Sequence, residues 1–256
     1  MKKFLIAGNW KMNTDKETSV ELSLKIKNNL KEIKHGVDVL VCPPAINIAK
    51  VVEVLSDTQI KVGAQNAHFF KEGAYTGEIS VPMIKSYGCE YIILGHSERR
   101  EYFNEDNQLI SQKVQTTLDF DLNAIVCIGE TLQERRAGRT FDILKNQIRA
   151  CLSNVNRKKI DKLIIAYEPV WAIGTGESAD VIQIEEAHRM IRLELIDLFG
   201  NYFGQQVKIL YGGSVNSRNA DEILKIDNVN GALIGGASLD AQSFSAIVNY
   251  AEDLVD

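Results

Sequence analysis

The sequence predicts an α/β protein that folds as a single (β/α)8 barrel, a closed parallel sheet of eight strands surrounded by helices. Eight short apolar runs recur along the 256 residues, and helical patterns separate most of them. One strand and one helix then occupy about 32 residues, the length of a β/α unit, and eight such units close a barrel. No linker, charge block or low-complexity segment divides the chain, so we expect one domain over residues 1–256.

The eight apolar runs are continuous rather than alternating, which is typical of strands buried on both faces of a parallel sheet. A doubly wound open sheet would show the same alternation of strands and helices. The expected strands cover residues 4–8, 37–41, 59–64, 91–95, 123–127, 163–167, 207–212 and 231–236.

Two helices have clear sequence signals. The stretch TDKE predicts a helix start, because Thr14 and Glu17 have the spacing of a capping box. We expect Gly36 to end this helix. A second helix is expected from about residue 179 to residue 199. Apolar residues mark the buried face of the first helix at positions Leu22, Ile26, Leu30 and Ile33.

The composition limits the classes of partner. Hydrophobic residues make up 45% of the chain and charged residues 25%, as in ordinary globular proteins. The net charge of −5 argues against nucleic acid or an anionic membrane as a partner, because both require a basic surface. Any anionic substrate must therefore be held by local groups rather than by the overall field.

The cysteines and the N-terminus indicate a cytoplasmic protein. The four cysteines have no zinc-ligand spacing and are interpreted as reduced thiols. The apolar run at 4–8 is shorter than the roughly 7–15 residues of a signal peptide. No stretch reaches the ~18 apolar residues of a membrane span. We expect neither a metal nor a cofactor.

Paired glycines at the ends of the last two strands predict a phosphate site. Gly212-Gly213 precedes Ser214, and Gly235-Gly236 precedes another predicted helix start. Such glycines let backbone N–H groups approach an anion, and barrel enzymes often hold phosphate in the loops after strands seven and eight. Either pair alone would be interpreted as a tight turn.

Other strand ends carry side chains suited to catalysis. His96 precedes a predicted helix start, which disfavours the imidazolium, so a neutral His96 is expected to polarise a carbonyl. Glu98 is explained by the helix dipole and is assigned a supporting role. Lys11 is open to three interpretations: a solvated lysine, a Schiff-base nucleophile, or a cation facing an anionic substrate.

The sixth strand ends at Glu168, and a loop with Pro169 at its start and glycines near its end follows. The stretch GTGESA at 174–179 resembles a dinucleotide fingerprint, but it does not directly follow the strand, so we discard that interpretation. The loop is better interpreted as a lid with two hinges. Its closure would remove water from Glu168 and strengthen it as a base.

With these residues assembled, the chain resembles the triosephosphate isomerase family over its whole length, which implies the TIM barrel fold. The matching motifs are GNWKMN (8–13), GAYTGE (73–78), ILGHSERR (93–100), CIGE (127–130), YEPVWAIGTG (167–176), YGGSV (211–215) and ALIGGASL (232–239).

The resemblance implies interconversion of D-glyceraldehyde 3-phosphate and dihydroxyacetone phosphate through an enediolate, in glycolysis and gluconeogenesis, without metal or cofactor. It implies that Glu168 is the general base, His96 the neutral electrophile and Lys11 the stabilising cation. It also implies that Thr76, in GAYTGE, lies in a loop that enters the partner subunit, and hence that the protein is a homodimer. The substrate-binding residues by this match are Asn9, Lys11, Gly174, Ser214, Gly235 and Gly236.

The chain departs from the family pattern at the far lid hinge, where Glu177 and Ser178 replace the more frequent residues, and we expect Glu177 to alter lid opening. Two other functions remain open: a Schiff-base aldolase that uses Lys11, and a catalytically silent barrel kept as a binding protein. Borohydride trapping with substrate separates the aldolase from an isomerase, which forms no imine.

Overall fold

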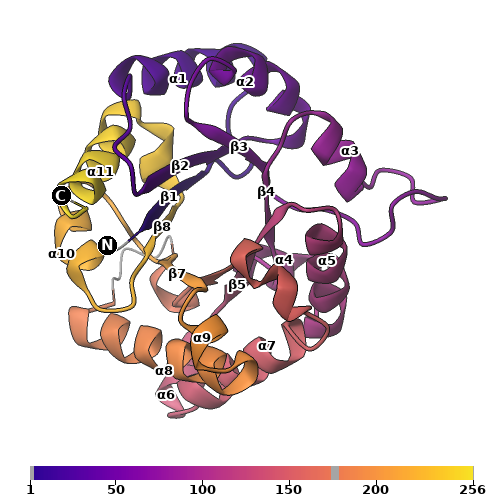
Figure 1. The fold of residues 1–256 in the computed structure, drawn as a ribbon, viewed down its shortest axis with the longest axis vertical. Coiled ribbons are helices and arrows are strands. Elements are labelled where there is room, and N and C mark those ends of the chain that lie inside the picture. Colours follow the sequence, from indigo (N-terminus) through magenta and orange to yellow (C-terminus); the bar gives the residue numbers. More distant parts are fainter. Residues whose placement is uncertain (1–2, 174–178, 256) are drawn as a thin grey trace.

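A computed structural model describes residues 3–173 and 179–255, and its centre is a closed barrel of parallel strands in the order β1 to β8 (Figure 1). This confirms the predicted fold and excludes the open sheet, because β1 pairs with both β2 and β8. The strands are β1 (Phe4–Asn9), β2 (Val37–Cys42), β3 (Lys61–Ala64), β4 (Tyr91–Leu94), β5 (Asn123–Ile128), β6 (Leu163–Tyr167), β7 (Lys208–Tyr211) and β8 (Gly231–Ile234).

The helices form a ring outside the barrel, and α11 packs beside α1 where the two ends of the chain meet (Figure 1). They are α1 (Lys16–Asn29), α2 (Ile48–Leu55), α3 (Val81–Ser86), α4 (Ser97–Tyr102), α5 (Asn107–Asp119), α6 (Leu132–Arg136), α7 (Thr140–Cys151), α8 (Val181–Phe199), α9 (Asn201–Gly204), α10 (Ala220–Lys225) and α11 (Ala241–Asp253). Short 3₁₀ turns cover Ala45–Asn47, Arg157–Lys162, Val170–Ala172 and Gly236–Leu239.

The continuous apolar runs are explained by two apolar layers that meet at the sheet. On β1, Leu5 and Ala7 point into the barrel, while Phe4 and Ile6 belong to the layer between barrel and helices. Both sets are buried, so the period of two that a strand imposes is not visible as an apolar/polar pattern. The barrel interior is therefore a packed core, and a site for a ligand is expected beyond the strand ends.

The predicted start and end of the first helix are wrong. The N-cap of α1 is Asp15, which forms a capping box with Thr18, and Thr14 lies outside it with a φ of 74°. The helix ends at Asn29, so Gly36 does not cap it and instead precedes β2 with a φ of 103°. The second helix is confirmed as α8, whose capping box joins Asp180 and Gln183.

All of the cysteines are free and buried. Within the described residues, no helix combines the length and the apolar character needed to cross a membrane.

Candidate active site

A pocket of about 320 Å³ lies at the carboxyl ends of the strands, where the sequence places its candidate residues. The strands are parallel, so their ends meet at one rim of the barrel although they are far apart in the sequence. The predicted residues that line this pocket are Asn9, Lys11, His96, Glu168, Gly212, Gly213, Ser214, Gly235 and Gly236.

Glu168 follows β6 directly, and only 2% of its surface is exposed. One carboxylate oxygen, Oε2, accepts a hydrogen bond of 2.9 Å from the Ser97 backbone N–H. The other, Oε1, lies 3.1 Å from Nε2 of His96. A buried carboxylate needs such donors, since an unpaired charge would be costly to bury. The carboxylate thus lies beside an imidazole at the edge of an open pocket.

His96 is the N-cap of α4, and its Nδ1 accepts a 3.2 Å hydrogen bond from the Glu98 backbone N–H. A nitrogen that accepts carries no proton, so the ring proton is on Nε2 and the imidazole is neutral. The 3.5 Å approach of Nδ1 to the Glu98 carboxylate is therefore not an ion pair. The structure places the Nε2–H donor toward Oε1 of Glu168.

Lys11 adopts the left-handed conformation, with a φ of 52°. Its backbone is held on both sides: the N–H donates to Oδ1 of Asn9 at 3.1 Å, and the carbonyl accepts from Nε2 of Gln65 at 2.8 Å. Its ammonium forms a 2.6 Å ion pair with Glu98. Strained backbone that neighbouring groups hold in place is typical of functional sites. Glu98 therefore orients the cation in addition to favouring the helix start.

A buried carboxylate holds the start of the loop after β6. Oε1 of Glu130 accepts hydrogen bonds from Nε1 of Trp171 at 3.0 Å and from the hydroxyl of Tyr167 at 3.2 Å, and it lies 3.0 Å from Arg135. Burial, and then the Glu130 charge, raise the pKa of Tyr167. The lid interpretation also involves Gly174, which lies outside the described residues, as do Glu177 and Ser178.

The glycines of the last two strands bring backbone close to the pocket. A Cβ on Gly212 would lie 2.9 Å from Cγ of Glu168, so a side chain there would displace the carboxylate. A Cβ on Gly235 would lie 3.4 Å from Cε of Lys11, whereas one on Gly236 would meet nothing within 4 Å. The pocket therefore has a wall of backbone facing an ammonium, which suits an anion.

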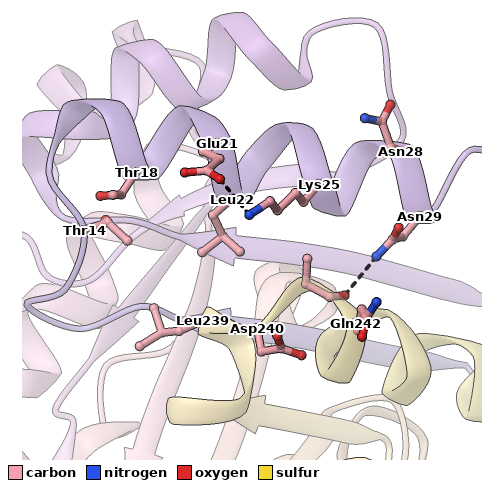
Figure 2. A pocket seen from close by; sticks show the side chains of 11 residues that line it. Thr14, Thr18, Glu21, Leu22, Lys25, Asn28, Asn29, Leu239, Asp240 and Gln242 are labelled. Carbon is pink, nitrogen blue, oxygen red and sulfur yellow. Dashed lines mark hydrogen bonds and ion pairs between the residues drawn. The ribbon is translucent and has the colours of Figure 1, made fainter.

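A second hollow, of about 650 Å³, lies between α1 and the N-terminal end of α11 (Figure 2). Its polar groups bond to one another: Lys25 pairs with Glu21 at 2.7 Å, and the Asn29 amide donates to the Ala241 carbonyl at 3.3 Å. It contains none of the strand-end residues. We therefore assign the chemistry to the smaller pocket, where charged groups converge on open space.

Several residues of the site have no individual signal in the sequence. The Ser97 N–H binds Glu168, Gln65 holds Lys11, and Ile173 and Leu233 line the pocket. Glu130 lies within the motif CIGE (127–130), but the sequence predicts no role for it. Thr76, predicted to serve the partner subunit, lies in an exposed loop and does not line the pocket. Among the described residues, no cluster of three His, Cys, Asp or Glu could hold a metal ion.

Comparison with known proteins gives one family. The family model described as triosephosphate isomerase matches residues 4–251. The chain is 46% identical over 247 residues to the triosephosphate isomerase of Lawsonia intracellularis, covering 96% of this chain and 98% of the relative. It is 44% identical over 250 residues to that of Alkaliphilus oremlandii, covering 98% of this chain and all of the relative.

Proposed function

This chain belongs to the triosephosphate isomerase family, and we propose that its Glu168, His96 and Lys11 carry out the proton transfers of that reaction. The reaction is the interconversion of dihydroxyacetone phosphate and D-glyceraldehyde 3-phosphate in glycolysis, and the family is cytoplasmic. It moves one proton between two adjacent carbons and one between two oxygens. It therefore needs a base, a donor to oxygen and a group that stabilises negative charge.

Glu168 is the base that removes the carbon-bound proton. A positioned base contributes about 10²–10⁴ in rate, so the developing enediolate charge needs further stabilisation. His96 supplies it through Nε2–H, and the Lys11 ammonium supplies a positive charge; a preorganised donor contributes roughly 10²–10³. His96 has a single ring N–H, which faces the Glu168 carboxylate. When this N–H donates to a substrate oxygen instead, the carboxylate loses that contact and is free to take the proton from carbon.

The substrate phosphate occupies the glycine-lined side of the pocket. That side is lined by the backbone of Gly235 and Gly236 and by Ser214. The Lys11 side chain lies next to Gly235, and Asn9 lies beside Lys11. Gly174 is assigned to the same phosphate site by the family resemblance alone. This arrangement needs no metal or cofactor, because the charges that change during the reaction are met by protein groups. We also propose that residues 1–256 form one domain.

The observation that carries the proposal is the buried contact between Glu168 and Nε2 of His96, at 3.1 Å beside the open pocket. The test is turnover of D-glyceraldehyde 3-phosphate in an NADH-coupled assay, for the parent and for Glu168→Gln, which keeps the shape and removes the base. We expect the variant to lose several orders of magnitude in kcat. The exposed Glu101, changed to Gln, is the matched control and should leave kcat unchanged.

Equal rates in the parent and in Glu168→Gln would remove Glu168 from the role of base. Trapping by borohydride in the presence of substrate would point to an aldolase that uses Lys11. The geometry opposes that chemistry, because Nζ of Lys11 is held by the Glu98 carboxylate at 2.6 Å, whereas a Schiff-base nucleophile needs a free amine. A parent without turnover would indicate the silent binding protein.

We further propose that the enzyme is a homodimer. The segment 71–79, which includes Thr76 and Tyr75, is exposed along its length and protrudes from the barrel before α3 (Figure 1). Met12 is 96% exposed and Ile46 is 89% exposed. Exposed apolar side chains of this kind are typical of an interface.

A hollow of about 270 Å³ beside this loop is lined by Gln65, the residue that holds the Lys11 carbonyl. A partner's loop seated in this hollow would support Lys11, and the same contact would occur in both directions. Sedimentation velocity tests the dimer. Tyr75→Asp should give monomers with reduced activity, and Tyr202→Asp, on α9, should remain dimeric. A parent that sediments as a monomer at micromolar concentration would overturn the proposal.

A further inference from the structure

The backbone that follows β5 lies directly against the main chain of Glu168. The Glu168 N–H donates to the Ile128 carbonyl at 2.7 Å, and the Val170 N–H donates to the Glu130 carbonyl at 3.1 Å. Between these two bonds lies Gly129, where a Cβ would stand 1.7 Å from the Glu168 carbonyl oxygen. The position of the Glu168 backbone therefore depends on the position of the Gly129 backbone.

Gly129 is held from its other side by one side chain of α7. Oε1 of Gln147 accepts the Gly129 N–H at 2.8 Å, and Nε2 of Gln147 donates to the Gly129 carbonyl at 3.0 Å. The side-chain amide has an acceptor and a donor in one plane, as a peptide group does. Gln147 thus bonds to Gly129 as a neighbouring strand would, at a point where β5 has already ended.

The surroundings of this contact are open. Gly129 and Gln147 line a hollow of about 820 Å³ together with Trp171 and Ile173, and this hollow adjoins the active-site pocket at Ile173. Among the residues that the structure describes, no side chain fills this hollow to press Gly129 toward Glu168 from that direction. The paired hydrogen bonds of Gln147 supply the constraint that packing supplies elsewhere at the rim.

We propose that Gln147 is a positioning residue for the catalytic base, because it sets the Gly129 backbone against which Glu168 is placed. Gln147 lines the outer hollow and not the active-site pocket, so it acts on the reaction only through Gly129. Proton abstraction is sensitive to such placement, since a displacement of about 1 Å costs roughly 10²-fold in rate. This inference rests on the proposed role of Glu168 as base.

Gln147→Met tests the proposal, because methionine has a similar length and forms neither hydrogen bond. We expect kcat to fall about tenfold or more, up to the roughly 10²-fold of a 1 Å displacement, with KM within twofold of the parent. The primary isotope effect on kcat should rise with substrate deuterated at the transferred position, because proton abstraction is the step that slows. Gln147→Glu keeps the acceptor and loses the donor, so its kcat should lie between that of the parent and that of Gln147→Met.

The matched control is Asn146→Met, which places the same side chain at the adjacent, exposed position in the same hollow. It should leave kcat and the isotope effect at parent values. A lower melting temperature for Gln147→Met, with kcat and the isotope effect unchanged, would overturn the positioning role and leave a structural one. Glu168→Gln in the same assay separates the two proposals: an active Glu168→Gln overturns both, whereas an inactive Glu168→Gln with a fully active Gln147→Met overturns this one alone.

Discussion

Gly129→Ala probes the contact beneath Glu168, the proposed base, most directly, since it adds a single methyl group at the point where two strand-end backbones meet. The new Cβ would stand 1.7 Å from the Glu168 carbonyl oxygen, and real Cβ atoms essentially never approach closer than 3.0 Å. The two backbones must therefore separate by about 1.3 Å, and a displacement of about 1 Å costs roughly 10²-fold in rate. This factor corresponds to about 2.7 kcal/mol of activation free energy.

The assay is the steady-state rate of D-glyceraldehyde 3-phosphate isomerisation, with the melting temperature recorded for each variant. Gly129→Ala should lower kcat about 10²-fold and also lower stability by about 1–3 kcal/mol, the usual cost of overpacking. Gly138→Ala is the control, because a Cβ there meets nothing within 4 Å and only the φ of 69° opposes it. It should lose about 1–2 kcal/mol of stability and keep the parent kcat.

A Gly129→Ala variant with kcat within threefold of the parent would refute the reasoning. It would mean that the main chain of Glu168 can move without moving its carboxylate, or that the rate does not depend on that placement. A variant that fails to fold is recognised by its circular dichroism, and Gln147→Met, which adds no Cβ at Gly129, then tests the same contact through its two lost hydrogen bonds.

Three further outcomes are expected. Lys11→Met should lower kcat/KM by at least 10²-fold, because it removes the cation that we propose faces the enediolate, and an unchanged value would exclude that role. Asn228→Asp should raise the melting temperature, by about 2–4 °C for each kcal/mol that it adds to the free energy of unfolding. Nε of the buried Arg192 donates to the amide oxygen of Asn228, and burial lowers the pKa of Arg192 to about 10. A carboxylate at position 228 would be a stronger acceptor for this guanidinium. A lower melting temperature would contradict this reasoning. Stability should fall as pH rises from 9 toward 12, because burial raises the pKa of Cys89 from 9.0 to about 12 and the unfolded chain releases that proton first. Urea unfolding at pH 8 and pH 10 should show a smaller decline for Cys89→Ala, and an equal decline in both proteins would assign the effect elsewhere.

The barrel and the positions of its chemical groups were predictable from local signals. A strand buried on both faces must be apolar throughout, so the eight runs identified the strands to within one or two residues. A carboxylate, a histidine or a lysine at the end of such a run breaks the apolar pattern of the core, and parallel strands bring all such ends to one rim. Glu168, His96 and Lys11 were therefore identifiable before any coordinates, and the motif resemblance assigned their roles.

Some local signals were ambiguous, and tertiary contacts decided between the alternatives. Thr14 and Glu17 have the spacing of a capping box, but so do Asp15 and Thr18 one residue later. The second pair forms the cap, and Asn47, on the neighbouring turn, donates to the carbonyls of both Thr14 and Asp15 and so ties the start of the helix to that turn. No pattern within the helix itself contains that information.

The sequence by itself predicted the α/β class, the strand positions and the candidate residues at the strand ends, because periodicity and strand ends are properties of consecutive residues, whereas the pairing of β1 with β8 closed the barrel only in the tertiary structure. Only the tertiary structure decided how those residues are held. The ion pair of Lys11 with Glu98 joins residues 87 positions apart, and the bonds of Gln147 to Gly129 join a helix to a loop 18 positions earlier. Such contacts exist only after the barrel closes, since closure sets which side chains come within hydrogen-bond distance of which strand end.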